Sequence, residues 1–162
     1  MIQARKGHSF NAVGEEFLIA TGGRDSAGKY LTSCELYEMA RDEWTALPPL
    51  QVPRTQHTAC VVGNRSFYVF CGKKQTFMGE YPTNEIEFLE SKNSHHWEVI
   101  STSNQFSPRT ECGAIETDNY ELLIFGGVNK DGTPLMDAFV MNTITQTISL
   151  SSKDTGKELN LR

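Results

Sequence analysis

Short apolar runs recur along the chain, and turn residues break them about every 8 to 12 positions. Within these runs apolar and polar residues alternate, or about four apolar residues stand together, and neither arrangement has the 3.6-residue period of a helix. Three of the runs end on glycine: Phe17–Gly23, Phe67–Gly72 and Leu122–Gly127. The pattern predicts an all-β chain of short strands with almost no helix.

Several markers repeat in one register. The first is a four-residue motif before an apolar strand, found as Arg5-Lys6-Gly7-His8, Arg54-Thr55-Gln56-His57 and Arg109-Thr110-Glu111-Cys112. The arginines lie 49 and 55 residues apart, and the glycine pairs that follow repeat at the same spacings. An alternating strand comes next, and then a bulky residue: Trp44, Trp97 and Ile148. A period near 50 with four short strands is typical of a propeller blade.

This pattern of R-x-x-H, apolar strand, Gly-Gly, Tyr and Trp resembles the kelch repeat over about residues 5–150. The first repeat has every marker, including Tyr37, whereas the second has Cys71 in place of the first glycine and Leu89 or Phe88 in place of the tyrosine. The third has Cys112 for histidine and Ile148 for tryptophan. The resemblance implies three four-stranded antiparallel blades, a partial propeller or half of a six-bladed wheel. The repeats would cover about 5–50, 51–105 and 106–150, before a polar tail at 151–162.

Some repeat positions are expected to be structural. Glycine would end the second strand where a Cβ would clash or oppose a positive φ, and the cysteine at position 71 suggests that only the second glycine is strictly required. The tryptophans would fill the wedge between blades, with Trp44 better enclosed than Trp97. The arginines would pair with Glu35, Glu87 or backbone carbonyls between blades. The structural set is Arg5, Arg54, Arg109, Gly22, Gly23, Gly72, Gly126, Gly127, Tyr37, Trp44 and Trp97.

The resemblance also implies that ligand is met at one end of the central channel, by residues after each arginine and each glycine pair. These are Lys6, Thr55, Gln56, Thr110 and Glu111, with Arg24, Asp25, Ser26, Lys73, Lys74, Gln75 and Asn129. Their mixed charges suit a protein or peptide partner. Phe77, Met78 and Tyr81 lie in a polar loop nearby, where they either fold back onto the blade or act as contact anchors.

Composition narrows the class of protein. The net charge is −5 with scattered basic residues, which disfavours nucleic acid, and no apolar run reaches the length of about 18 that a membrane helix needs. The four cysteines form no C-x-x-C pair, so no zinc site is predicted and reduced core thiols are expected. A cytoplasmic location follows, with nuclear, cytoskeletal or ciliary sites as alternatives.

No nucleophile elbow, phosphate loop or dinucleotide fingerprint is present in the sequence, and His95-His96 precede Trp97 without other ligands at metal spacing. We therefore expect no enzyme activity, no cofactor and no metal. The leading function is a protein-binding adaptor or scaffold. A fragment of a kelch-propeller enzyme, of oxidase or specifier type, and a purely structural subunit of a larger assembly remain as alternatives.

Three blades would leave the outer faces of the first and last blade uncovered. If each exposes on the order of 500 Å² of apolar surface, the pair forgoes roughly 25 kcal/mol as an upper bound. We expect these faces to be covered by a second copy, by a partner that supplies blades, or by further blades of a longer polypeptide. In the symmetric case, Ser9–Val13 of one copy would lie beside the third blade of the other, with Phe139 and Met141 or Val140 near the contact.

Overall fold

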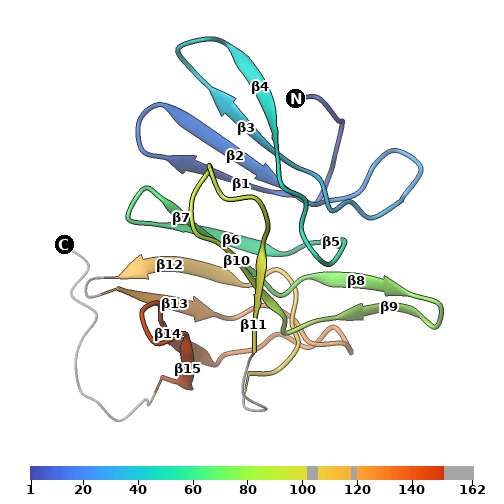
Figure 1. Ribbon diagram of the computed structural model, residues 1–162. Helices are drawn as coiled ribbons and strands as arrows, with labels where there is room; N and C mark the ends of the chain where they lie inside the picture. The colour runs from blue at the N-terminus through green and yellow to red at the C-terminus, as the bar shows by residue number, and fades with distance from the viewer. Residues whose placement is uncertain (102–105, 118–119, 152–162) are drawn as a thin grey trace.

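Three four-stranded antiparallel sheets follow one another in the computed structural model, which describes residues 1–101, 106–117 and 120–151 (Figure 1). Blade 1 contains β1 (Ser9–Val13), β2 (Phe17–Thr21), β3 (Cys34–Glu38) and β4 (Glu43–Leu47). Blade 2 contains β6 (Thr58–Val62), β7 (Ser66–Phe70), β10 (Ile86–Leu89) and β11 (Glu98–Ile100). Blade 3 contains β12 (Gly113–Thr117), β13 (Glu121–Phe125), β14 (Ala138–Asn142) and β15 (Thr147–Leu150).

A fourth, three-stranded sheet stands apart from the blades and consists of β5 (Arg54–Thr55), β8 (Lys73–Thr76) and β9 (Gly79–Pro82). The first strands of the blades contact one another, β1 against β6 and β6 against β12, so they form the inner edge of the arc. The all-β class and the kelch-type blades of a partial propeller are thus confirmed. Most of the expected polar tail, 152–162, lies outside the described residues.

The core lies in two layers, one on each face of blade 2. Strand β7 shows how it forms, because successive side chains of a strand point to opposite faces. Phe67 and Val69 join the layer against blade 1, whereas Tyr68 and Phe70 join the layer against blade 3. A strand buried on both faces needs apolar residues in succession, which explains the unbroken run of this segment.

Trp97 is the better enclosed of the two tryptophans, so the expectation that favoured Trp44 is wrong. Trp97 is 1% exposed, lies in the layer between blades 1 and 2, and donates its indole N–H to the Pro48 carbonyl at 2.9 Å. Trp44 is only half-buried on the outer face of blade 1, where its ring centroid lies 5.0 Å from that of Tyr37. The difference arises because blade 2 has a neighbour on that side, whereas no described residue packs as a neighbouring blade against blade 1 there.

Each motif arginine is held within its own repeat. Arg54 donates to the Glu87 carboxylate at 2.7 Å, with both side chains fully buried, and to the carbonyls of Cys71 and Glu85 at 2.9 Å. Glu87 also accepts the backbone N–H groups of Gln51 and Val52. The ion pair thereby attaches the linker from blade 1 to strand β10 of blade 2.

The other two repeats vary this arrangement. Arg5 forms an ion pair with Glu35, which also accepts the backbone N–H groups of Ile2 and Gln3. The partners suggested by the sequence are therefore present, although the pairing is within repeats and not between them. In blade 3, Arg109 instead contacts Asp137 at 2.7 Å, and its guanidinium lies 5.0 Å from the Phe139 ring centroid.

Glycine is required at the two positions of the pair for different physical reasons. At the second position, Gly72 has a φ of +91°, and a Cβ there would lie 2.7 Å from the Thr55 carbonyl oxygen, so a side chain is excluded by backbone. At the first position, a Cβ on Gly22 would lie 2.8 Å from the Arg54 carbonyl oxygen and from Cε1 of His57. Glycine at position 22 is therefore required as well, by the neighbouring blade.

Replacing the two tryptophans should separate their burial. Trp97→Ala should lower the free energy of unfolding by about 3–5 kcal/mol, because it removes a fully buried ring. Trp44→Ala should cost only about 1–2 kcal/mol, because its ring is only partly buried. Urea denaturation of both variants measures the difference, and equal losses would contradict the burial described above.

Arg54→Ala should lower the free energy of unfolding by about 3–5 kcal/mol, because it leaves the Glu87 carboxylate buried without its partner. The matched control is Arg65→Ala, which breaks the exposed ion pair between Arg65 and Glu90 and should cost less than about 1 kcal/mol. Thermal and urea denaturation report both effects. An unchanged stability of Arg54→Ala would show that this arginine has no structural role.

Candidate protein-binding surface at the loop end

The three repeats project the same small element at one end of the blades, to the right in Figure 1. In blade 2 it is the β5–β8–β9 sheet. In blade 1 single bridges join Lys6 to Arg24 and Arg24 to Tyr30, and in blade 3 they join Thr110 to Val128 and Val128 to Pro134. The segment after each motif arginine therefore pairs with the segment after each glycine pair. We call this end of the molecule the loop end.

Backbone hydrogen bonds connect the repeats around the inner edge of the loop end. The Gln56 N–H donates to the Gly7 carbonyl at 2.8 Å, and the Glu111 N–H donates to the Gln56 carbonyl at 3.0 Å. All three residues have φ between +53° and +63°, so the chain has the same left-handed conformation at this position of each repeat. The Gln56 side-chain amide also donates to the Glu111 carboxylate at the surface. Two of the expected binding residues thus meet across the second and third repeats.

Two other residues that were expected to bind a partner do not lie at the surface. Thr55 and Thr110 are each 2% exposed. The Thr55 hydroxyl donates to the Gly7 carbonyl at 3.1 Å, so it packs against the preceding repeat and cannot reach a partner. The sequence could not show this, because the contact joins residues of different repeats.

The remaining expected residues are partly or fully exposed at the loop end: Lys6, Arg24, Asp25, Ser26, Gln56, Lys73, Lys74, Gln75, Phe77, Tyr81, Glu111 and Asn129. Some of them also shape their loops. The Asp25 carboxylate accepts the Lys29 N–H at 2.9 Å, and the Asn129 side chain accepts those of Asp131 and Thr133 at 2.9 Å. Asp25 and Asn129 therefore help to fix the loops on which the other residues stand.

The β8–β9 hairpin of blade 2 carries an apolar tip. Phe77 is 99% exposed and Met78 is 71% exposed, so Phe77 does not fold back onto the blade. The turn is fixed by local hydrogen bonds, since Thr76 Oγ1 accepts the Met78 N–H at 3.2 Å and the Tyr81 hydroxyl donates to the Met78 carbonyl at 2.9 Å. An ordered hairpin thus presents two large apolar side chains to water.

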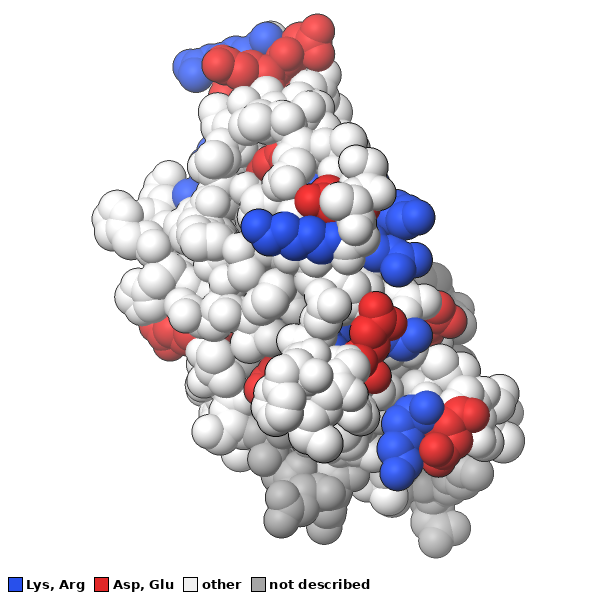
Figure 2. Space-filling model, turned by 90° about the vertical axis from the view of Figure 1, so that its right-hand side faces the viewer, with Lys and Arg blue, Asp and Glu red and all other residues white. Residues whose placement is uncertain are grey.

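Charges of both signs surround this tip. Figure 2 looks onto the loop end and shows basic and acidic groups interspersed among uncharged surface, with neither sign dominant. Lys74 is already paired with Glu85 at 3.0 Å. Partial burial raises the pKa of the Glu85 carboxyl, but the hydrogen bonds from Lys74 and Thr83 outweigh it, so the pKa is lowered overall. The surface is therefore mixed in charge, and it differs from the uniformly basic surfaces that bind nucleic acid.

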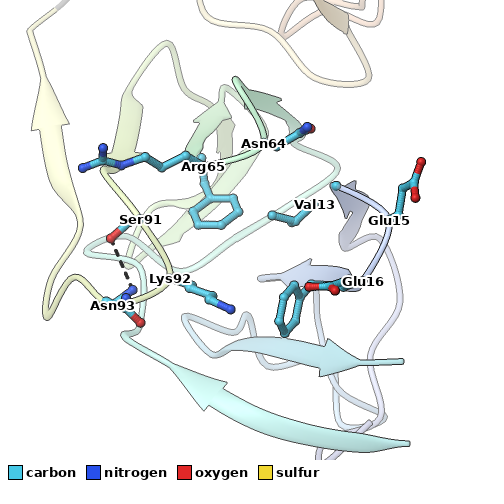
Figure 3. A pocket seen from close by; sticks show the side chains of 11 residues that line it. Val13, Glu15, Glu16, Asn64, Arg65, Ser91, Lys92 and Asn93 are labelled. Atoms are coloured by element: carbon cyan, nitrogen blue, oxygen red, sulfur yellow. Dashed lines mark hydrogen bonds between the residues drawn. The ribbon is translucent and has the colours of Figure 1, made fainter. Parts of the chain in front are cut away.

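A cavity of about 560 Å³ lies at the opposite end, between the β1–β2 and β6–β7 turns and the loop after β10 (Figure 3). Val13, Phe17 and Phe67 form its apolar part, and the Lys92 ammonium lies 3.5 Å from the Phe17 ring centroid. Glu15, Glu16, Asn64, Arg65, Ser91 and Asn93 complete the lining. Sequence reasoning missed it, because its walls come from turns of two different repeats. Its apolar floor and charged rim could accept a small amphipathic group.

The described residues, 1–101, 106–117 and 120–151, offer neither a metal-binding cluster nor a membrane-spanning helix. No three His, Cys, Asp or Glu side chains in these ranges stand close enough together to hold a metal ion. His95 and His96 are exposed on the loop between β10 and β11. Over the same ranges, no helix has the length and apolar character needed to cross a membrane.

Comparison with known proteins gives the family. The KLHDC2/KLHL20/DRC7 Kelch-repeats domain matches residues 1–159. The chain is 29% identical over 142 residues to alpha-scruin of Limulus polyphemus, which covers 85% of this chain and 15% of scruin. It is 27% identical over 135 residues to Kelch-like protein 7 of Rattus norvegicus, covering 80% of this chain and 22% of that protein. The chain thus spans less than a quarter of either relative, and by the match over nearly its whole length it belongs to the kelch-repeat family.

Proposed function

We propose that this chain is a protein-interaction module, an adaptor or scaffold that binds a protein or peptide through its loop end. The observation that carries the proposal is the β8–β9 hairpin, which holds Phe77 and Met78 in water on an ordered frame. Large apolar side chains held in water on an ordered frame are frequent anchors in protein interfaces.

The polar residues around the hairpin define the chemistry of the partner. Lys6, Lys73 and Glu111 are exposed or partly exposed and belong to three different repeats. A polar rim of both charge signs around an apolar anchor is the usual composition of a protein interface. The partner should therefore offer an apolar recess for Phe77, flanked by acidic and basic groups.

Membership of the kelch-repeat family supports binding over catalysis, because repeated blades form a scaffold and the loops carry recognition. We accordingly propose a non-enzymatic role without cofactor. The four cysteines, Cys34, Cys60, Cys71 and Cys112, are all unpaired and buried. Free thiols in such number support a reducing, intracellular location for the chain.

A photo-crosslinking amino acid at position 77 tests the binding surface directly. Benzoylphenylalanine in place of Phe77 should crosslink one discrete protein when cells expressing the chain are irradiated. The same group in place of Ile144, which is also exposed but lies in the β14–β15 turn, should not capture it. Phe77→Ala with Met78→Ala should then weaken affinity for the captured protein by about 30-fold or more, as expected for anchor residues.

Two controls separate binding from folding. The thermal midpoint of the Phe77→Ala, Met78→Ala variant should be unchanged, because neither side chain packs in the core. Gln56→Ala with Glu111→Ala should weaken the same affinity with little change in stability, because their hydrogen bond is exposed. Undiminished affinity in both variants, measured by calorimetry, would show that the loop end is not the binding surface.

We also propose that blades cover the two outer faces of the arc. The outer face of blade 1 carries Phe10, Leu18 and Trp44 at the positions that Ala59, Phe67 and Trp97 occupy on the buried face of blade 2. The outer face of blade 3 carries Ile115, Leu123 and Val140 where blade 2 has Cys60, Tyr68 and Phe88. Each face therefore matches one side of a blade-to-blade contact already present in the molecule.

The simplest occupant for the isolated chain is a second copy, which would place Ser9–Val13 of one chain beside blade 3 of the other. Of the two faces that the sequence offered for this contact, the one with Phe139 and Met141 packs against blade 2, so the face with Val140 is the open one. A partner protein or further blades of a longer polypeptide would fill the same faces in the same way.

Light scattering tests whether two copies of the chain associate. The chain should have twice the mass of an 18.1 kDa monomer, and Val140→Asp should reduce it to the monomer mass or precipitate it, because the charge enters an apolar contact. Ile144→Asp is the control, because its side chain already faces water, and it should leave the mass unchanged. A folded, soluble monomer of wild-type sequence that persists at all concentrations would exclude self-association.

A further inference from the structure

Across each blade-to-blade contact, the first position of one glycine pair meets the last position of the next R-x-x-H motif. Between blades 1 and 2 these positions hold Gly22 and His57, and a Cβ on Gly22 would lie 2.8 Å from the imidazole Cε1. The buried imidazole accepts or donates one hydrogen bond at 3.0 Å to Thr21 Oγ1, and burial followed by the nearby Arg54 charge lowers its pKa to about 3. The histidine ring therefore fills the space in front of the glycine.

Between blades 2 and 3 both positions hold cysteine. Cys71 has a φ of +61°, close to the +57° of Gly22, so its Cβ points across the contact in the same direction. Cys112 occupies the place of the histidine, and the loss of the ring leaves room for the Cys71 side chain. Both are free thiols in one core cluster, with Cys71 fully buried and Cys112 7% exposed. The two substitutions compensate each other and create a pair of facing thiols.

The backbone around the two thiols is fixed. The Gly72 N–H donates to the Arg109 carbonyl at 3.0 Å, and the Cys71 carbonyl accepts from Arg54 at 2.9 Å. Neither residue depends on a mobile loop to bring the sulfurs together. The hydrogen bond that the two thiols share therefore joins two fixed backbone positions, one in each blade.

The surroundings make the two thiols unequal. A hydrogen bond from Cys71 and the positive charge of Arg109 lower the pKa of the Cys112 thiol, whereas burial raises that of Cys71. For comparison, burial raises the pKa of Cys34 to about 12 and that of Cys60 to about 11. Because the thiolate is the reactive form, Cys112 is the nucleophile of the pair and Cys71 is the resolving thiol.

We propose that Cys71 and Cys112 are a redox-active dithiol that a hydroperoxide converts to a disulfide joining blades 2 and 3. The Cys112 sulfur attacks one oxygen of hydrogen peroxide, the O–O bond breaks, and a sulfenic acid forms on Cys112 while the other oxygen leaves as water. The Cys71 sulfur then attacks the Cys112 sulfur, the S–O bond breaks, and the hydroxyl leaves as a second water with the Cys71 proton. Two thiols lose two electrons in total, and one peroxide is reduced.

The disulfide would lie directly beneath the loop end. Cys71 and Gly72 immediately precede β8, and Cys112 immediately follows Glu111. Oxidation therefore adds a covalent link between the elements that carry the hairpin and the Gln56–Glu111 contact. This inference rests on the packing of the two blades and does not depend on the proposed binding function.

The test is peroxide treatment of the folded chain, followed by thiol alkylation and peptide mapping. A linked peptide pair containing Cys71 and Cys112 should appear on the order of tenfold faster than any loss of the Cys34 or Cys60 thiols, because burial raises the pKa of both of those thiols. A thiol reductant should reverse it. With Cys71→Gly, the resolving thiol is absent, and a sulfenic acid on Cys112 should be trapped by dimedone.

The matched control gives the second contact the glycine and histidine of the first, with Phe70 at the place of Thr21. Cys71→Gly with Cys112→His should fold and show no peroxide-dependent linkage, whereas Cys112→His alone should be less stable, because the ring meets the Cys71 side chain. Cys71→Ser, which only removes the sulfur, serves if the double variant fails to fold. Free thiols at both positions after peroxide treatment of the folded chain, or a linkage that forms only in urea, would overturn the proposal.

Discussion

The buried Arg54–Glu87 ion pair is the contact on which the arrangement of successive blades depends. Removing both charges from water carries a large desolvation penalty, which is offset only when every charged group is well hydrogen-bonded. Arg54 donates to one carboxylate and two carbonyls and leaves its buried Nε without a partner, while Glu87 accepts from the guanidinium and from two backbone N–H groups. The linker between blades therefore has one low-energy path. That path places Gln56 and His57 against the preceding repeat.

All three repeats have a buried motif arginine, but its partners and the residues at the blade-to-blade contact differ between repeats. In blade 3 the position of Glu87 is taken by Phe139, and Arg109 is held by Asp137 and by aromatic rings. At the contact between blades 2 and 3, two cysteines replace a glycine and a histidine that fit only as a pair. A change at one side of a close-packed contact is tolerated when the opposite side changes in volume to match.

The loop end can vary in length, whereas the blades are constrained by strand pairing and core packing. The β8–β9 hairpin extends the same bridge that the other two repeats form with a few residues, so its extra length does not change the strands of the blade. Since loops tolerate insertion far better than strands, this is where an interaction surface can be elaborated without disturbing the core. The cavity at the opposite end is made by the β1–β2 and β6–β7 turns and the loop after β10.

The sequence by itself determined the strands and the blades, because strand periodicity can be read within each repeat and the markers recur in register. For the motif arginines it offered Glu35, Glu87 or backbone carbonyls as partners, and only the structure showed that each arginine is held within its own repeat. Which residues are covered was decided only by the tertiary structure. Trp97 is enclosed and Trp44 is not, Thr55 and Thr110 are buried, and Phe77 stands in water. Each of these outcomes depends on whether a neighbouring repeat lies against the residue, and one strand's pattern carries no information about what its neighbour supplies. The facing thiols of Cys71 and Cys112 have the same origin, since two positions 41 residues apart become neighbours only when two blades pack.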